Sequence, residues 1–393
     1  MSKASVGFAP GLLRRILFRA IISAVAVAVS LSVVQTEVAA QTPGNNEWDP
    51  KKTWIFAAGV IQFDDKDLQS WPDHNRIDDK MIQAYIRRGV PDDHIFYIKN
   101  KMATKANLEE KLAEHAKKAG KDDTFIFYYT GHGSRDYKQD SRPVNFMTYD
   151  TDSKWMVSDI VKTIQKNFTG NRVLLTADCC YSGAILEEVS RMSSRLPIAV
   201  FTSSRASSTS TGAWTFTQII TDALNGSPLL DLNGDGNITF QEMANYADEE
   251  MSFVEEQRVT YFPRPGSFFN KDLIFAKATA KKAPRVGERL EGEENGKWYK
   301  IKVLDSKDNK VFVTWLGWAT TFDTWLTPEQ IRPYKPVMMK NGTPIEIEWD
   351  KKWWKGSIVK NEMGLYFVHY DGYKDIDNEW VALNRVRLPK NQD

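Results

Sequence analysis

Phe125–Ser134 reads Phe-Ile-Phe-Tyr-Tyr-Thr-Gly-His-Gly-Ser, and Val173–Gly183 reads Val-Leu-Leu-Thr-Ala-Asp-Cys-Cys-Tyr-Ser-Gly. Each stretch is an apolar, β-prone run that stops at glycine beside a reactive side chain. This pattern is typical of a buried parallel strand that carries chemistry at its carboxyl end. Because sites in α/β sheets form just outside the carboxyl ends of the strands, two neighbouring strands of this kind can place an imidazole beside a thiol. A cysteine nucleophile with a general base needs these two groups.

Strands and helices alternate around the two stretches. Further strands are expected at 53–61, 94–98, 196–203 and 271–275, and helices at 77–88, 104–118, 158–169, 214–224 and 240–255. The alternation predicts an α/β fold with a mostly parallel sheet covered by helices on both faces. We assign this domain to residues 52–278, after a linker at 41–51.

The amino terminus has the composition of a secretory signal. Three arginines precede an apolar run at 20–34, and Val38-Ala39-Ala40 offers small residues for cleavage. We therefore predict a signal peptide at 1–40, a mature chain that begins near Gln41, and a secreted or periplasmic protein without membrane contact after cleavage. An uncleaved membrane anchor is the alternative, although the apolar run is short and interrupted by serines.

Charge and cysteine content narrow the function. Loss of residues 1–40 removes four basic and one acidic residue from totals of 52 and 51, which leaves a net charge near −2 and no reason to expect nucleic-acid binding. An exported protein normally uses its cysteines in disulfides. The two cysteines here, Cys179 and Cys180, are adjacent. A disulfide between neighbours would strain the backbone and would link no distant parts of the chain. A reactive thiol is the better interpretation.

The carboxyl-terminal part changes character after a linker at 279–284. It is rich in tryptophan and β-prone, and it matches itself without gaps at an offset of 55 residues: Trp298 with Trp353, Phe312 with Phe367, Trp325 with Trp380 and Arg332 with Arg387. The match indicates two copies of one small unit, at 285–335 and 336–390. Short alternating strands separated by turns suit small antiparallel barrels.

The two strand ends suggest a catalytic pair. His132 can take the proton of a thiol at the end of the second stretch. The amides of Gly133 and of the cysteine itself can form an oxyanion hole, because glycine lets a backbone N–H approach the substrate closely. The alternative is that the cysteine fills the core and His132 is a turn residue, since buried cysteine is common. The glycines at both strand ends favour the catalytic interpretation.

The same residues carry a family resemblance. Tyr128–Gly133 followed by Asp178–Gly183 closely resembles the paired signatures of caspase-like cysteine peptidases, and of metacaspases in particular. The resemblance implies the caspase-hemoglobinase fold and a dyad of His132 and Cys180 that requires no third member. Its register selects Cys180, not Cys179, as the nucleophile. The next residue is a tyrosine where metacaspases often have histidine, which leaves the subfamily open.

The resemblance also points to a substrate pocket. Metacaspase-like enzymes place acidic residues of the S1 pocket at positions that match Asp178 and Asp78, and Asp79 is an equal candidate for the second position. Two carboxylates there predict cleavage after Arg or Lys at P1 by charge pairing. Asp78 also begins a predicted helix, where the helix dipole favours an acidic residue without any binding role. Ser203, after the next strand, is a candidate for the border of the pocket.

A second motif, at 231–242, reads Asp-Leu-Asn-Gly-Asp-Gly-Asn-Ile-Thr-Phe-Gln-Glu. It fits the calcium loop of an EF-hand, with glycine at position 6, an apolar residue at position 8 and these expected ligands: Asp231, Asn233, Asp235, Asn237 and Glu242. A glycine and a proline interrupt the entering helix. We therefore predict a loop-plus-helix Ca²⁺ site, structural or activating, with a merely polar turn as the alternative. No organic cofactor is expected.

The carboxyl-terminal repeats resemble Tudor-like or Agenet-type members of the SH3-like barrel group, notably in Val368–Tyr373 and Glu379–Val381. The resemblance implies recognition of peptides or methylated side chains through aromatic cages, with four candidates: Trp315, Trp318, Tyr370 and Tyr373. Such aromatics are also common packing residues, which is the alternative. For an exported protein, a peptide or envelope ligand is a more sensible expectation than chromatin.

Together these patterns predict an exported caspase-like cysteine endopeptidase. In this interpretation Cys180 attacks a peptide carbonyl, His132 acts first as base and then as acid, and the repeats localise the enzyme or gate its substrate. One rival is a catalytically idle caspase-like scaffold that binds through the repeats, and the intact His/Cys pair argues against it. Another rival is transpeptidation or ligation, because an amine can resolve an acyl-enzyme in place of water.

Overall fold

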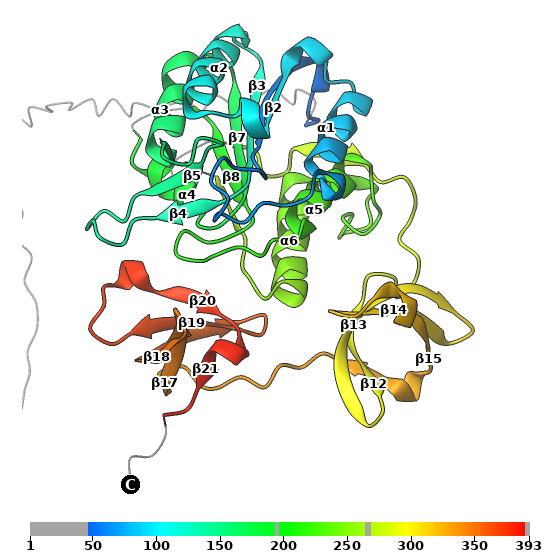
Figure 1. Ribbon diagram of the computed structural model, residues 1–393. Coiled ribbons are helices and arrows are strands. Elements are labelled where there is room, and N and C mark those ends of the chain that lie inside the picture. Colours follow the sequence, from blue (N-terminus) through cyan, green and yellow to red (C-terminus); the bar gives the residue numbers. More distant parts are fainter. Residues whose placement is uncertain (1–45, 193–195, 264–268, 390–393) are drawn as a thin grey trace, which may run out of the picture. The chain divides into compact units, whose positions relative to one another are not determined.

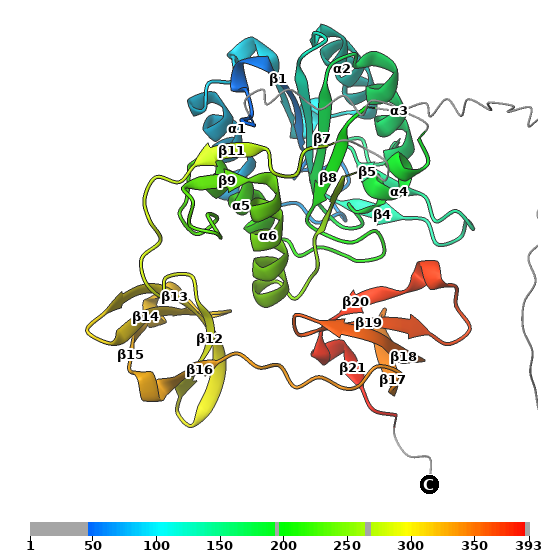
Figure 2. The same ribbon diagram turned by 180° about the vertical axis from the view of Figure 1, so that it is seen from behind.

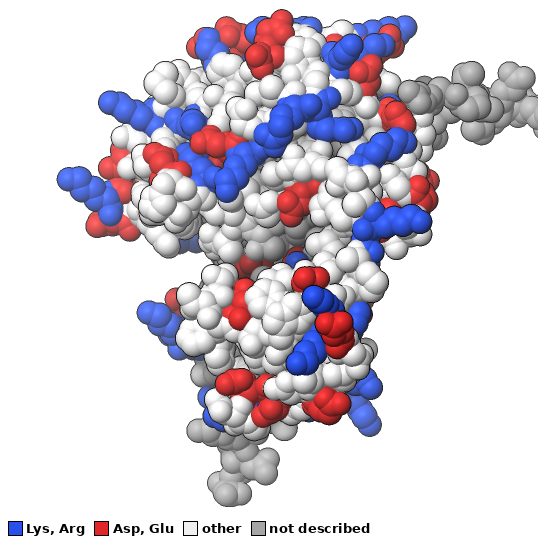
Figure 3. Space-filling model, turned by 90° about the vertical axis from the view of Figure 1, so that its right-hand side faces the viewer, with Lys and Arg blue, Asp and Glu red and all other residues white. Residues whose placement is uncertain are grey.

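The computed structural model describes residues 46–192, 196–263 and 269–389. The predicted signal peptide at 1–40 and the first part of the predicted linker at 41–51 lie outside these residues. Within the described part of the chain, no helix combines the length and the apolar character that a membrane span requires. Figure 3 shows basic and acidic side chains interspersed on the face that it presents, so this face carries both signs of charge.

The two quoted stretches form adjacent strands in the middle of a six-stranded sheet (Figure 1). The strand order is β10-β8-β7-β3-β1-β2, and all neighbours are parallel except β10 with β8. The strands are β1 (Thr53–Gly59), β2 (Ile95–Lys99), β3 (Thr124–Thr130), β7 (Arg172–Asp178), β8 (Ile198–Thr202) and β10 (Thr260–Pro263). Every residue of β3 is buried, as expected for a strand covered on both faces.

Helices cover both faces of this sheet, as Figures 1 and 2 show. Tyr128 lies in the core formed with three of them, and its neighbour Phe127 lies in the core formed with the other three, because successive side chains of a strand point to opposite faces. The first set is α1 (Asp78–Arg87), α5 (Thr215–Leu224) and α6 (Phe240–Val254), and the second is α2 (Lys105–Lys118), α3 (Val157–Asn167) and α4 (Ala184–Ser190). The predicted α/β fold with a mostly parallel, helix-flanked sheet is confirmed.

Two smaller antiparallel sheets accompany the main sheet. One contains β4 (Gly133–Arg135), β5 (Val144–Met147) and β6 (Lys154–Met156), and the other contains β9 (Asn237–Thr239) and β11 (Ile274–Lys277). The strand expected at 271–275 is therefore β11, which pairs with β9 and does not join the main sheet. One edge of the main sheet is β10, a short strand whose Pro263 is tolerated because an edge strand need not donate every backbone N–H.

The carboxyl-terminal part forms two five-stranded antiparallel sheets with the same strand order. The first runs β15-β14-β13-β12-β16 and the second β20-β19-β18-β17-β21. Their strands are β12 (Arg289–Glu294), β13 (Lys297–Lys307), β14 (Lys310–Trp315), β15 (Thr324–Leu326), β16 (Ile331–Pro333), β17 (Pro344–Trp349), β18 (Lys352–Glu362), β19 (Leu365–Tyr370), β20 (Glu379–Val381) and β21 (Val386–Arg387). Irregularities of register fall at Val303/Asp305 and at Ile358/Lys360, which are equivalent positions of the repeat. Two small antiparallel units were predicted, and their assignment to SH3-like barrels stays a prediction.

Candidate active site

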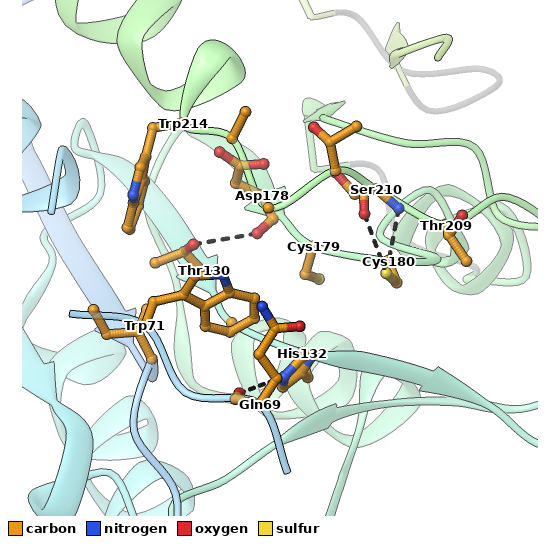
Figure 4. Close-up of a pocket in the computed structure, with 15 residues that line it drawn as sticks. Gln69, Trp71, Thr130, His132, Asp178, Cys179, Cys180, Thr209, Ser210 and Trp214 are labelled. Atoms are coloured by element: carbon orange, nitrogen blue, oxygen red, sulfur yellow. Dashed lines mark hydrogen bonds between the residues drawn. The ribbon is translucent and has the colours of Figure 1, made fainter. Parts of the chain in front are cut away.

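A pocket of about 360 Å³ lies at the carboxyl ends of β1, β3 and β7 (Figure 4). The register of the sheet sets Gly59 beside Thr130, and Thr130 beside Asp178. The described residues that line the pocket are Ile61, Gln69, Trp71, Thr130, Gly131, His132, Asp178, Cys179, Cys180, Thr209, Ser210, Thr211, Gly212, Ala213 and Trp214. Both quoted strand ends therefore contribute to one cavity, as the topology of an α/β sheet leads one to expect.

His132 follows a turn that depends on glycine. Gly131 has φ +149°, and a Cβ atom at this position would lie 2.3 Å from the carbonyl oxygen of Val60. The Nε2 atom of His132 lies 2.8 Å from the carbonyl oxygen of Gln69. A carbonyl only accepts, so Nε2 carries the proton and Nδ1 keeps its lone pair. Burial lowers the pKa of His132, which favours the neutral imidazole that a general base requires.

Cys180 presents its thiol to the pocket beside the loop that follows β8. Its Sγ accepts a hydrogen bond from the Ser210 N–H at 3.2 Å and lies 3.7 Å from the Ser210 carbonyl oxygen, to which the thiol donates (Figure 4). Burial raises the pKa of the Cys180 thiol, although the Ser210 N–H opposes this shift. With the pKa of His132 lowered, both shifts favour a neutral thiol and a neutral imidazole over an ion pair in this state.

Gly133 joins the two strand ends. It begins β4, and a Cβ atom on it would lie 2.0 Å from the backbone carbonyl oxygen of Cys180. The absence of a side chain is therefore what lets the turn after β3 pack against the turn after β7. The predicted oxyanion role of the Gly133 amide stays a prediction. Cys179, in contrast, is 3% exposed and belongs to the core that contains Phe127.

Asp178 is the one carboxylate among the described residues that line the pocket. Its Oδ2 accepts hydrogen bonds from the Thr217 hydroxyl at 2.6 Å and from the Thr217 N–H at 3.3 Å. Burial raises the pKa of Asp178 to about 6, although the Thr217 hydroxyl counters this shift. Asp178 therefore changes its charge within the physiological range of pH.

The other predicted S1 residues do not line this pocket. Asp78 begins α1, as predicted, but it is fully buried and bound by Arg76, with Nη2 2.6 Å from Oδ2. Asp79 has a half-exposed side chain that pairs with Lys99 at 3.1 Å. Ser203 is fully buried, and its hydroxyl lies 3.1 Å from that of Ser210. The structure thus brings Asp178 to the dyad and leaves Asp78, Asp79 and Ser203 outside the lining.

Sequence reasoning missed much of the pocket wall, including Gln69, Trp71, Ser210 and Trp214. The Trp-Pro pair in the polar segment after β1 was a weak signal, because a bulky apolar side chain in a loop often packs against a site. Trp71 does so here, with its indole 4.5 Å from the His132 ring between centroids. Nothing local marks Gln69 or Ser210, because both act through backbone atoms.

The predicted calcium loop has part of the expected geometry. Gly236 has φ +84° at position 6, Ile238 is buried at position 8, and α6 follows. Asp231 accepts the Gly236 N–H at 3.0 Å, and Glu242 accepts the Thr239 N–H at 3.0 Å in a capping box of α6. The remaining predicted ligands also make hydrogen bonds: Asn233, Asp235 and Asn237. The all-oxygen donor set suits Ca²⁺. Within the described residues, no group of three or more His, Cys, Asp or Glu is arranged to hold a metal ion.

The predicted cage aromatics divide into packed and exposed members. Trp315 is buried and stacks on Trp318, which is 38% exposed, with ring centroids 5.6 Å apart. In the second repeat, Tyr370 is buried and its hydroxyl donates to Glu379 at 2.6 Å, whereas Tyr373 is 43% exposed. One aromatic of each pair is therefore a packing residue and the other faces solvent.

Comparisons with known proteins bear on the α/β part of the chain. A search of curated proteins found no match. Among solved structures, the chain is similar to the crystal structure of protein GSU0716 from Geobacter sulfurreducens, with 17% identity and a TM-score of 0.42 over 58% of this chain and 99% of that chain. Residues 73–189 match the family model of the metacaspase, peptidase C14 domain, and this match supports a caspase-like domain in the part of the chain that carries His132 and Cys180.

Proposed function

We propose that this chain is a caspase-like cysteine endopeptidase that uses a dyad of His132 and Cys180. The observation that carries the proposal is that these two side chains border one pocket, and that the Gln69 carbonyl accepts from Nε2 of His132. This hydrogen bond leaves Nδ1 free to accept a proton. The match of residues 73–189 to the metacaspase peptidase domain supports the same assignment.

The reaction begins with release of the thiol from Ser210. As substrate enters, Nδ1 of His132 takes the Sγ proton of Cys180, and the sulfur forms a bond to the carbonyl carbon of the scissile peptide. The C=O electron pair moves to oxygen, where the amides of Gly133 and Cys180 donate to the oxyanion. The protonated imidazole then gives its proton to the leaving amine as the C–N bond breaks.

Water completes the cycle. His132 takes a proton from a water molecule, whose oxygen attacks the thioester carbon and displaces the Cys180 sulfur, and the sulfur recovers its proton from the imidazole. The products are a carboxylic acid and the free thiol. An amine in place of water would give ligation, so the ratio of hydrolysis to transpeptidation measures which acceptor the site admits.

For the P1 residue we propose a basic side chain. Asp178 supplies a carboxylate to the pocket. Trp71 and Trp214 also line it, and indole faces attract cations. Charge pairing at Asp178 thus favours Lys or Arg over acidic residues.

The test is a panel of fluorogenic peptides with Arg, Lys, Asn or Asp at P1, assayed on the full mature chain and on Cys180→Ala. Turnover of the basic peptides that disappears in Cys180→Ala is expected. Absence of thiol-dependent turnover on any peptide would favour the idle scaffold. Turnover restricted to the Asp peptide would overturn the acidic-pocket argument and keep the enzyme.

We also propose that the loop at 231–242 binds Ca²⁺ after its carboxylates exchange backbone N–H partners for the ion. The support is the all-oxygen donor set and the left-handed Gly236 at position 6. Isothermal titration of the full chain with Ca²⁺ should give a binding isotherm that Asp231→Ala removes. Equal heats and an equal melting temperature in EGTA would count against the site.

We also propose that the protein is exported. The apolar segment that follows three arginines within residues 1–40 supports secretion. Amino-terminal sequencing of the product recovered outside the cytoplasm would test this proposal.

The first repeat carries a cluster of aromatic side chains. Tyr299 and the exposed Phe322 extend the pair of Trp315 and Trp318, with ring centroids 5.1 Å and 5.5 Å from Trp318. This cluster supports a role in binding peptide or envelope ligands. Loss of ligand retention in Trp318→Ala, with unchanged peptide turnover, is the expected result.

A further inference from the structure

An arginine two residues before Asp78 occupies that carboxylate. The Nε and Nη2 atoms of Arg76 donate to Oδ1 and Oδ2 of Asp78 at 3.0 Å and 2.6 Å. The Tyr97 hydroxyl lies 2.6 Å from the same Oδ2. The side chains of Arg76 and Asp78 are 2% and 0% exposed. Both oxygens of Asp78 therefore have partners within the protein.

Arg76 is itself fully engaged. Its Nη2 also donates to the Gly59 carbonyl at 2.8 Å, and its Nη1 donates to Asp73 and Asn100, each at 3.2 Å. These bonds use all five N–H groups of a guanidinium. Arg76 therefore has no donor left for an acidic substrate side chain, and its effect on the pocket is to neutralise Asp78.

The Arg76–Asp78 pair lies at the carboxyl end of β1, beside the residues that line the pocket. A Cβ atom on Gly59 would lie 2.0 Å from Arg76 Nη2 and 2.1 Å from Asp78 Oδ2, so the pair fills the space that a side chain there would take. Gly59 is the register partner of Thr130, which lines the pocket, and Thr130 is the partner of Asp178. The carboxylates of Asp78 and Asp178 thus lie on either side of the end of β3. Arg76 neutralises the first of them by forming an ion pair with Asp78.

The carboxylate that remains suits an ammonium better than a guanidinium. Oδ2 of Asp178 already accepts two hydrogen bonds from Thr217, at 2.6 Å and 3.3 Å, and the Ser203 hydroxyl also hydrogen-bonds to this carboxylate. A guanidinium fork gains most from two free oxygens, whereas an ammonium is a point charge that can use one. We infer that Arg76 is a specificity-determining residue, which holds Asp78 out of substrate recognition and so makes the site prefer Lys to Arg at P1. This inference rests on the proposed peptidase function.

The experiment compares kcat/KM for two peptides that differ only in Lys or Arg at P1. The wild-type chain should cleave the Lys peptide at least about threefold faster. In Arg76→Gln the freed Asp78 carboxylate offers a second acceptor, so the Arg-to-Lys ratio should rise by about tenfold, as expected for one charge-assisted hydrogen bond. Adding Asp78→Asn to Arg76→Gln removes that acceptor and should return the ratio to within about twofold of wild type.

A matched control separates this effect from the loss of a buried ion pair. Arg258 pairs with Asp248 at 2.7 Å, with side chains that are 6% and 3% exposed. Arg258→Gln should destabilise the chain and leave the Arg-to-Lys ratio unchanged.

The outcomes are distinguishable. Absence of Cys180-dependent cleavage overturns the peptidase proposal and this inference together. Cleavage with the same ratio in wild type and Arg76→Gln overturns the inference alone, as does a raised ratio that persists in the double variant. If Arg76→Gln fails to fold, the wild-type ratio still decides, because a preference for Arg over Lys contradicts the inference.

Discussion

The ring of His132 lies against the indole of Trp71, with centroids 4.5 Å apart and planes inclined by 39°. This contact contributes to the burial that lowers the pKa of His132. Because the base must be neutral to act, wild-type activity should persist to a lower pH than an ordinary histidine allows. Trp71→Ala should lower kcat/KM about tenfold and move the acid limb of its pH profile upward, toward the ordinary histidine pKa of about 6.5.

Two further variants make that result specific. Trp71→Phe keeps a ring against the imidazole and should retain most of the wild-type profile. Trp325→Ala removes a 41% exposed indole in β15 and should leave the pH profile of kcat/KM unchanged. A neutral P1 peptide is used throughout, so that titration of Asp178 does not alter recognition of the P1 side chain. An unmoved acid limb in Trp71→Ala would show that the indole does not tune the histidine.

The adjacent cysteines should differ sharply in reactivity. Both cysteines border the pocket, but Cys179 is 3% exposed and its side chain belongs to the core, whereas Cys180 is half-buried and its Sγ contacts Ser210. Cys180→Ala should lower kcat by at least about a thousandfold, as loss of a nucleophile does, and Cys179→Ala should keep activity within about threefold. Iodoacetamide should label Cys180 alone, at a rate that rises with pH beyond the ordinary thiol pKa of about 8.5, because burial raises the pKa of Cys180. Loss of activity in Cys179→Ala with retention in Cys180→Ala would reverse the assignment.

Gly133 should be intolerant of any side chain. Its Cβ atom would lie 2.0 Å from the Cys180 carbonyl oxygen, a backbone atom of the turn that follows β7. We expect Gly133→Ala to lower the free energy of unfolding by at least about 2 kcal/mol, as overpacking does, and to lower the thermal midpoint of the α/β domain. Gly120→Ala is the matched control, because its Cβ would meet the Asp123 carboxylate at an ordinary 3.4 Å. Equal midpoints for the two variants would show that the turns can separate at little cost.

The sequence predicted what depends on local pattern. The runs that end at Thr130 and Asp178 are mostly apolar and β-prone, so their burial and parallel pairing followed from composition and alternation. The start of α1 at Asp78 was also predicted, from apolar spacing along the helix. The partner of Asp78 was not, because Arg76 lies outside any periodic element and reaches Asp78 only when the loop after β1 folds back over Gly59.

The same limit explains the pocket wall. Trp71 and Gln69 belong to a polar segment whose path is set by tertiary contacts, such as the hydrogen bond from the Trp71 N–H to the Ile61 carbonyl at 2.9 Å. Ser210 lies in a run of small residues, where no side chain distinguishes the backbone amide that meets Cys180. Almost every residue type offers the same backbone N–H and C=O groups, so residue type cannot predict contacts made by backbone atoms. These contacts could be identified only in the folded structure.

Asp178 predicts a specificity that depends on pH. Burial raises its pKa to about 6, so the carboxylate is charged above that pH and neutral below it. The ratio of kcat/KM for a Lys peptide to that for a Gln peptide should therefore fall by about tenfold between pH 7.5 and pH 5, because roughly nine-tenths of the charge is lost one unit below the pKa. Titration of the dyad affects both peptides alike and cancels in the ratio. Asp178→Asn should give a low ratio that does not vary with pH. A wild-type ratio that stays constant from pH 7.5 to pH 5 would mean that a group other than Asp178 recognises the basic side chain.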